Sequence, residues 1–333
     1  MLPSKFNFLV IFVVQLFFLG CKKNDDNEKK YLLQKLSPAE TGVSFQNNLT
    51  EDEAHSIINY IYFYNGGGVS VGDINNDGLP DIYFVSNQGY NKLYLNNGNL
   101  KFEDITAKAK VGGSSDWSTG STMIDINNDG LLDIYVCAVA GLLDFKGHNE
   151  LFINNGDGTF SEKAAAYGLD FKGYSTQTYF FDYDKDGDLD AYIVNHAVHT
   201  NLSHGPASER NNRRPLVGDV LLQNNEGKFT DVSEKAGIFG GVNGYGLSAS
   251  IADFNNDGYD DIITSSWSLK EPMHYCRNNG NGTFTDVSDS SWLGYLTGGL
   301  NIMQTDYNND GLKDIFVLRG AWKETFGKEP NSL

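Results

Sequence analysis

The sequence predicts an all-β protein, a β-propeller of four-stranded antiparallel blades with a calcium loop between the first and second strand of each blade. Three observations favour this fold. One acidic nine-residue loop occurs five times, strand-like segments surround each copy, and the first positions of successive copies lie 52 to 71 residues apart. About four and a half blades fit into the 333 residues, because only the first strands of the last repeat are present.

Each loop carries oxygen-bearing side chains at positions 1, 3, 5 and 9 and a glycine at position 6. Ca²⁺ prefers oxygen ligands, and glycine permits the sharp turn that wraps a loop around the ion. A polar turn without metal would explain one copy, but five copies with an acidic position 9 favour calcium. The predicted ligands are Asp73, Asn75, Asp77, Asp81, Asp125, Asn127, Asp129, Asp133, Asp182, Asp184, Asp186, Asp190, Asp253, Asn255, Asp257, Asp261, Asp306, Asn308, Asp310 and Asp314.

An EF-hand begins in the same way but requires Glu at position 12. Position 12 in this chain holds Phe84, Val136, Ile193, Thr264 and Val317. The formal net charge of −18 agrees with metal binding, because sixteen carboxylates stand at ligand positions and five Ca²⁺ ions would bring the charge to −8. Calcium is therefore the predicted cofactor, about five ions with a structural role. No basic stripe is present, so a nucleic-acid partner is not predicted.

Four strand-like segments belong to each complete repeat. In the first two repeats they span 66–72, 81–86, 92–96, 101–105, 118–124, 133–139, 150–153 and 159–162. Their recurrence every fifty-odd residues is typical of propeller blades, whereas a solenoid of calcium turns would need a loop about every nine residues. The predicted blades span 65–112, 117–169, 174–240, 245–293 and, in part, 298–333. Residues 42–46 are predicted to form a further strand before the first blade.

Small residues stand seven positions before each loop, which predicts inner strands crowded around a central axis. These residues are Gly66, Ser118, Ser175, Gly246 and Gly299. Aromatic residues directly precede three of them, namely Trp117, Tyr174 and Tyr245. The aromatic rings either pack between blades or stack on sugars. The cysteines Cys137 and Cys276 lie in different repeats and are predicted to be buried core thiols.

Residues 1–21 have the form of a targeting segment. Lys5 precedes an apolar run over 8–19, which has the length of a signal-peptide core and is too short to span a bilayer. The run ends at Gly20-Cys21 and resembles a bacterial lipobox, whose cysteine is lipidated; an ordinary signal peptide is the alternative. Residues 22–35 then form a flexible tether, and 36–333 the propeller. These features predict an outer-membrane lipoprotein of the bacterial cell envelope that is held to the membrane only by its lipid. In a further version of this hypothesis the protein is exposed on the cell surface.

The loops, the Asn-Asn-Gly-x-Gly-x-Phe hairpins and the segment 229–237 resemble FG-GAP/VCBS repeats. These are integrin α-type propeller blades, and the resemblance is to the bacterial branch related to cartilage acidic protein and associated with ASPIC/UnbV segments. It covers about 36–333, although no ASPIC/UnbV segment is present. The family implies a further calcium ligand, the carbonyl at position 7, which belongs here to Leu79, Leu131, Asp188, Tyr259 and Leu312.

The end of the chain aligns with the start of a third strand, because 331–333 matches 91–93 and 149–151. We therefore expect the sequence to be a fragment of a longer propeller. The alternative is a closed five-bladed ring in which the lead-in strands complete the last blade.

An insertion over 195–218 is the main irregularity among the repeats, and it is rich in histidine and arginine. It is either a solvated loop or a ligand loop for a transition metal or an anion. Its candidate residues are His196, His199, His204, Arg213 and Arg214.

No nucleophile with a base, P-loop or dinucleotide fingerprint is recognisable in the sequence. The chain is therefore predicted to be a calcium-binding surface lipoprotein whose propeller binds a glycan or a protein without catalysis. A calcium-dependent, lyase-like enzyme acting on polysaccharide and a structural subunit of an envelope complex remain the alternatives.

Overall fold

The computed structural model describes residues 33–198, 212–241, 244, 246–266, 272–319 and 331–332. Cys21, His199, His204 and Tyr245 lie outside these residues, as does the whole predicted targeting segment. The chain divides into two units, Met1–Ser37 and Pro38–Leu333. Of the first unit only 33–37 are described, and the fold below is that of the second. Among the described helices, none is long and apolar enough to cross a bilayer.

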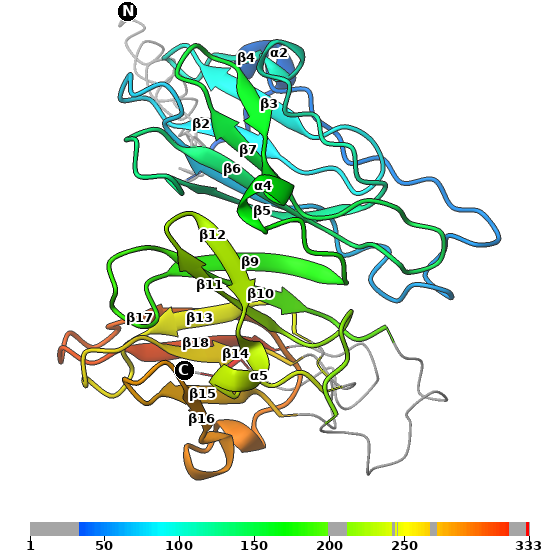
Figure 1. The fold of residues 1–333 in the computed structure, drawn as a ribbon. Helices are drawn as coiled ribbons and strands as arrows, with labels where there is room; N and C mark the ends of the chain where they lie inside the picture. The colour runs from blue at the N-terminus through cyan, green and yellow to red at the C-terminus, as the bar shows by residue number, and fades with distance from the viewer. Residues whose placement is uncertain are drawn as a thin grey trace, which may run out of the picture. The chain divides into compact units, whose positions relative to one another are not determined.

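Four antiparallel sheets of four strands follow one another along the chain (Figure 1). Blade 1 consists of β1 (Val69–Gly72), β2 (Asp81–Phe84), β3 (Lys92–Asn96) and β4 (Phe102–Asp104). Blade 2 consists of β5 (Ser118–Ile124), β6 (Asp133–Ala138), β7 (Glu150–Asn154) and β8 (Phe160–Glu162). Blade 3 consists of β9 (Ser175–Phe181), β10 (Asp190–Asn195), β11 (Val220–Asn225) and β12 (Lys228–Asp231). Blade 4 consists of β13 (Ala249–Ala252), β14 (Asp261–Thr264), β15 (His274–Asn278) and β16 (Phe284–Asp286).

Blade 5 is described only in part. Strand β17 (Gly299–Thr305) pairs with β18 (Asp314–Arg319), and Ser332 bridges Val317 where a third strand would pair. In every sheet the strands are neighbours in chain order, so each blade is a simple meander. The predicted all-β class and the four-stranded blades with a loop between their first two strands are confirmed.

The strand predicted over 42–46 is wrong. The segment follows the one-turn helix α2 (Pro38–Thr41) and forms no strand. Phe45 stacks on Phe84 with ring centroids 4.9 Å apart, and the Ser44 amide donates to the Tyr94 hydroxyl. These side-chain contacts hold the segment against blade 1, so that no ladder of backbone hydrogen bonds with a neighbouring strand forms.

A single helical turn follows the fourth strand of each complete blade. These turns are α3 (Thr106–Ala109), α4 (Ala164–Tyr167), α5 (Ser233–Ala236) and the 3₁₀ turn η2 (Ser288–Ser290), and a second 3₁₀ turn, η3 (Leu293–Tyr295), comes after η2. In blade 1, Asp104 Oδ1 accepts from the Thr106 amide, while the Thr106 hydroxyl accepts from the Leu93 amide. Blade 2 has no hydroxyl at this point, and Glu162 Oε1 accepts from the Ala164 and Leu151 amides instead. In blade 2 the Glu162 side chain thus makes both contacts that Asp104 and Thr106 make in blade 1.

The hydrophobic cores lie between consecutive blades rather than within them. Residues of blades 1 and 2 form one buried cluster, with Tyr83, Leu93, Ile134 and Val136 all inaccessible to solvent. Equivalent clusters join blades 2 and 3, blades 3 and 4, and blades 4 and 5. Cys137 and Cys276 lie in the second and third of these four cores as free, buried thiols, as predicted.

A polar side chain at the start of the third strand caps the end of the second strand. Asn91 Oδ1 accepts from the Ser86 amide, and Asn149 Oδ1 accepts from the Ala138 amide. Asn331 Oδ1 accepts from the Arg319 amide in the same way, which confirms the alignment of the chain end with the earlier third strands. Blade 3 makes this bond with a carboxylate, because Asp219 Oδ1 accepts from the Asn195 amide.

Asp219→Asn is expected to stabilise the protein at pH 7 by about 2 kcal/mol, because burial raises the pKa of Asp219 to about 6. A carboxyl whose pKa is higher in the folded than in the unfolded state loses stability as pH rises, here between about 4 and 6. Asparagine keeps the acceptor for Asn195 and removes the buried charge, and the Tyr192 hydroxyl, which donates to Asp219 Oδ2, would turn to accept from the new amide. Urea unfolding of both proteins at pH 4 and pH 7 should show the gain only at pH 7; a loss at pH 7 would mean that the Tyr192 hydrogen bond and the charges of His274 and Arg213 compensate the carboxylate.

Candidate acidic loops and axial pocket

The five predicted loops, here called the acidic loops, share one backbone shape. Position 4 has a positive φ in every copy, between 57° and 63°, and the glycine at position 6 has φ between 85° and 101°. A methyl group on Gly78 would meet nothing within 4 Å, so the conformation rather than crowding requires glycine there. This backbone turns the side chains of positions 1, 3 and 5 toward the loop interior.

The first acidic loop shows how these side chains are held. Asp73 accepts from the amides of Asp77 and Gly78, at 3.1 and 2.7 Å, and Asn75 Oδ1 accepts from the Asp77 amide. The second, fourth and fifth loops repeat these bonds. The backbone therefore fixes the side-chain oxygens that are predicted to be ligands.

The Asp at position 9 joins the acidic loop to the third strand of its blade. Asp81 accepts from the Asn96 amide through Oδ1, at 2.7 Å, and from the Ile74 amide through Oδ2, at 3.0 Å. Asp133, Asp190 and Asp261 hold the same place and, like Asp81, are inaccessible to solvent. Burial raises the pKa of Asp133 to about 6 and of Asp190 to about 7. A cation close to such a buried carboxylate would favour its charged form.

The third acidic loop comes nearest to a complete cation site. Carboxylate oxygens of Asp182, Asp184 and Asp190 lie within 4.8 Å of one another, and in the described part of the chain no other group of three His, Cys, Asp or Glu does so. Oδ1 atoms of Asp184 and Asp188 are buried without a hydrogen-bond partner among the described residues. Unpartnered oxygens beside a buried carboxylate fit a hard cation such as Ca²⁺, so the residues present suit the predicted metal.

A second site lies at the other end of the inner strands. Thr119, Thr176, Leu247 and Leu300 each stand six residues before the first Asp of their acidic loop, and all four line one pocket of about 350 Å³. The pocket therefore lies where the first strands of several blades converge, and we call it the axial pocket. Six residues of strand separate it from the acidic loops by about 20 Å.

Aromatic residues of the lead-in segment cover the axial pocket. Tyr60, Tyr62 and Phe63 pack with Trp117 and Phe145 in one buried cluster. Trp117 is 1% exposed and lies against Phe145, with ring centroids 5.0 Å apart. This packing agrees with the first of the two predicted roles of Trp117, and Trp117 also lines the axial pocket. The aromatic run over 59–64 was the sequence signal for this lid, and its role could not be assigned without the fold.

Among the described residues of the predicted ligand loop, His196 is the one that lines the axial pocket. It is 1% exposed, its ring lies 4.1 Å from that of Tyr62, and its Nε2 is 3.0 Å from the Tyr60 hydroxyl. Its Nδ1 is buried and has no hydrogen-bond partner among the described residues. Burial lowers the pKa of His196 to about 3, so the imidazole is neutral at pH 7.

The other described members of the predicted ligand loop do not join His196. Arg213 donates to the carbonyls of Ile238 and Asp219, which lie at the junction of blades 3 and 4. Arg214 is exposed, and its amide donates to the carbonyl of Gly240. The hypothesis of one shared histidine and arginine site is therefore not supported by the described residues.

A comparison with models of protein families identifies the repeats. The model of the FG-GAP-like repeat matches residues 73–136, 138–193 and 209–264, which is more than half of the chain. The chain belongs to the FG-GAP-like repeat family. Each matched segment contains at least one acidic loop and all or most of the second strand of the blade, which follows this loop. The predicted family resemblance is therefore confirmed at the level of the repeat.

Curated relatives are similar over part of this FG-GAP-like chain. Cartilage acidic protein 1 of Xenopus tropicalis is 28% identical over 218 residues, which cover 63% of this chain and 30% of the relative. The proteins of the same name from Mus musculus and Homo sapiens are 28% and 27% identical and cover 64% and 65% of this chain. The chain thus spans about a third of the length of these relatives.

The chain is also similar to solved structures at low sequence identity. A lectin of Agrocybe aegerita that recognises non-reducing terminal N-acetylglucosamine has 21% sequence identity and a TM-score of 0.44, over 75% of this chain and 59% of the lectin. The V. cholerae biofilm matrix protein Bap1 has 14% identity and a TM-score of 0.40, over 76% of this chain and 34% of Bap1.

Proposed function

We propose that the protein is a calcium-stabilised binding module whose axial pocket takes a neutral, hydroxyl-rich ligand such as a glycan. The observation that carries this proposal is the buried His196 Nδ1, which has no partner among the described residues and belongs to a side chain that lines a pocket. A buried nitrogen without a hydrogen bond costs roughly 1–3 kcal/mol. A ligand hydroxyl that bonds to it recovers that energy.

The chemistry of the pocket favours a neutral ligand over a charged one. Asn65, Asn87, Thr119 and Thr176 supply amides and hydroxyls, and no Asp, Glu, Lys or Arg stands among the described residues that line it. The neutral imidazole adds one donor or acceptor, depending on its tautomer. Pockets of this kind, mostly apolar with a few convergent polar groups, are the usual form of small-molecule sites.

Calcium is assigned a structural role in this proposal. The acidic loops lie about 20 Å from the axial pocket along the inner strands, so their ions would not contact the same ligand. Each loop instead fixes the connection between the first two strands of its blade. In the proposed setting, the protein is held at the bacterial envelope by a lipid on Cys21.

Replacing His196 by Leu is expected to weaken glycan binding at least tenfold, because the unpartnered nitrogen is lost. The measurement is retention of the untethered protein on a panel of polysaccharides, in calcium and in EDTA, with released oligosaccharides monitored. Phe145→Leu is the matched control, since it alters the same aromatic cluster without a polar atom. Tyr60→Phe, which removes only the hydroxyl beside Nε2, serves if the leucine variant does not fold.

Each outcome of this experiment is informative. Retention with intact polymer and its loss in the His196 variant would support the binding module. Retention followed by released oligosaccharide would instead favour the polysaccharide-acting enzyme. No retention on any polymer would contradict the glycan proposal and favour a protein partner.

A further inference from the structure

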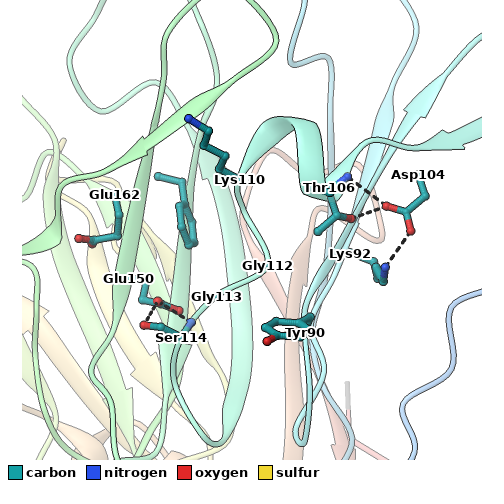
Figure 2. Close-up of a pocket in the computed structure, with 12 residues that line it drawn as sticks. Tyr90, Lys92, Asp104, Thr106, Lys110, Gly112, Gly113, Ser114, Glu150 and Glu162 are labelled. Carbon is teal, nitrogen blue, oxygen red and sulfur yellow. Dashed lines mark hydrogen bonds and ion pairs between the residues drawn. The ribbon is translucent and has the colours of Figure 1, made fainter.

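A larger cavity lies between blades 1 and 2, away from both the acidic loops and the axial pocket. Its volume is about 670 Å³, and Figure 2 shows its walls. Tyr90, Lys92 and Asp104 line it from blade 1, and Glu150 and Glu162 line it from blade 2. Nothing in the repeat pattern or in the proposed glycan site accounts for the charges in this cavity.

Comparison of equivalent positions shows what is unusual about blade 2. The third strand begins with a basic residue in two blades, and it pairs there with an acid of the fourth strand: Lys92 with Asp104 at 2.9 Å, and His274 with Asp286 at 3.1 Å. Glu150 holds this position in blade 2. The fourth strand of blade 2 offers Glu162, so two acids stand where blades 1 and 4 have an ion pair.

Only one of the two carboxylate oxygens of Glu150 is hydrogen-bonded to described residues. The side chain is 2% exposed, and Oε1 accepts from the amide and the hydroxyl of Ser114, at 2.9 and 2.7 Å. Oε2 is buried and has no hydrogen-bond partner within the described ranges. Glu162 uses its Oε1 for the backbone of α4 and is exposed.

The two lysines that line the cavity do not pair with these acids, and His148 attracts the Glu150 carboxylate without forming an ion pair with it. Lys92 is held by Asp104, and in Figure 2 the ammonium group of Lys110 points away from Glu150. Among the ion pairs of the described residues, none involves Glu150 or Glu162. A buried carboxylate without a counter-charge is costly, which suggests that the cation comes from outside the chain.

We propose that this cavity binds a ligand through a primary ammonium group, which donates to Glu150 Oε2 and lies within the field of Glu162. The ammonium takes the place that the Lys92 and His274 nitrogens have in blades 1 and 4. The site is independent of the axial pocket and does not require the glycan proposal.

An organic ammonium fits this cavity better than a metal ion does. Ca²⁺ takes six to eight oxygen ligands, and within the described chain Glu150 and Glu162 do not gather with a third acidic, His or Cys ligand. An ammonium group needs only a few acceptors, and a carboxylate is the strongest of them. Tyr90, whose side chain is 75% exposed at the rim, offers an aromatic face to the body of the ligand.

The backbone beside Glu150 leaves room for the ammonium group. Gly113 has φ 80°, and a methyl group there would lie 3.0 Å from Glu150 Oε2 and 2.8 Å from Asn91 Nδ2. Asn91 Nδ2 is itself buried, and the Asn91 side chain interacts with the Tyr83 hydroxyl. A ligand that carries an acceptor next to its ammonium, as an amino alcohol does, would bond to both Glu150 and Asn91.

The experiment titrates the full chain at pH 7 with glucosamine and with Nα-acetyl-lysine amide, and binding is followed by calorimetry. N-acetylglucosamine is the neutral control, because acetylation removes the positive charge. Glu150→Gln keeps the acceptor for Ser114 and is expected to weaken both amines at least tenfold. Glu103→Gln, an exposed acid on β4, is the matched control and should change nothing.

The two amines also distinguish the source of the ammonium group. If glucosamine binds more tightly, the natural ligand is an amino sugar. If the lysine derivative binds more tightly, the natural ligand is a lysine side chain of a protein. The proposal is overturned if neither amine binds below roughly 10 mM, a free energy of only about −2.7 kcal/mol. It is equally overturned if N-acetylglucosamine binds as well as glucosamine, or if Glu150→Gln binds the amines unchanged.

Discussion

Removal of calcium by EDTA is expected to lower the melting temperature strongly. An ion that binds only the folded state stabilises it by about 1.4 kcal/mol at a free concentration ten times Kd, so five sites would contribute roughly 7 kcal/mol. That equals a typical total stability for a folded domain. Without the ions, clustered acids such as Asp182, Asp184 and Asp190 would repel one another. Thermal unfolding in calcium and in EDTA measures the effect.

Two variants connect the calcium effect to the acidic loops. Asp190→Asn should lose part of the response to calcium, because the carboxylate belongs to the third loop. Asp157→Asn removes an exposed acid from the hairpin between β7 and β8 and should respond to EDTA as the unmodified chain does. A melting temperature that is the same in calcium and in EDTA would refute the structural role of the ion.

Gly120→Ala is expected to destabilise the protein by about 3 kcal/mol, because its methyl group has no space. The added Cβ would lie 2.1 Å from Gln177 Oε1 and 2.3 Å from the carbonyl oxygen of Thr176, both on the first strand of blade 3. The glutamine side chain could move, but the Thr176 carbonyl could do so only by separating two blades. Urea unfolding at saturating calcium would measure the loss.

Gly299→Ala provides the control for this substitution. Its methyl group would meet Met273 Sδ and Val317 Cγ1 at 3.4 Å, and its φ is not positive. We therefore expect a change below about 1 kcal/mol. Equal losses for the two variants would show that glycine is needed for a reason other than contact between inner strands.

Much of the fold was predictable because the spacing between the acidic loop and the strands is similar in every repeat. Strand β3 was predicted at its observed bounds, and the loops begin and end at the predicted Asp residues. Crowding of inner strands was predicted correctly, but the glycines named for blades 1 and 5 are not the crowded residues. Gly66 has φ 85°, and a methyl group added to it would meet nothing within 4 Å, whereas one on Gly68 would meet the backbone of Gly120 and Ser121.

The candidate sites were less predictable, because they depend on contacts between distant segments. His196 meets Tyr60, which lies 136 residues earlier, and no local pattern indicates that contact. The Glu150 cavity likewise needs the linker at Ser114, which lies 36 residues before it. An alignment of the repeats at Lys92, Glu150 and His274 would have shown that Glu150 is an acid at a position that is basic in blades 1 and 4. The alignment would not have shown that Glu150 Oε2 has no hydrogen-bond partner among the described residues. Acids in a local loop can be found from spacing, whereas a cavity between blades cannot.

The position of the cores between consecutive blades has a consequence for how such chains grow. Each core draws residues from two neighbouring blades, so inserting a copied blade creates one further junction of the same kind. Stability in such an array is a sum of nearest-neighbour terms. Duplication therefore preserves foldability, and the copies are then free to diverge at single positions, as Glu150 has done where its counterparts in blades 1 and 4 are basic.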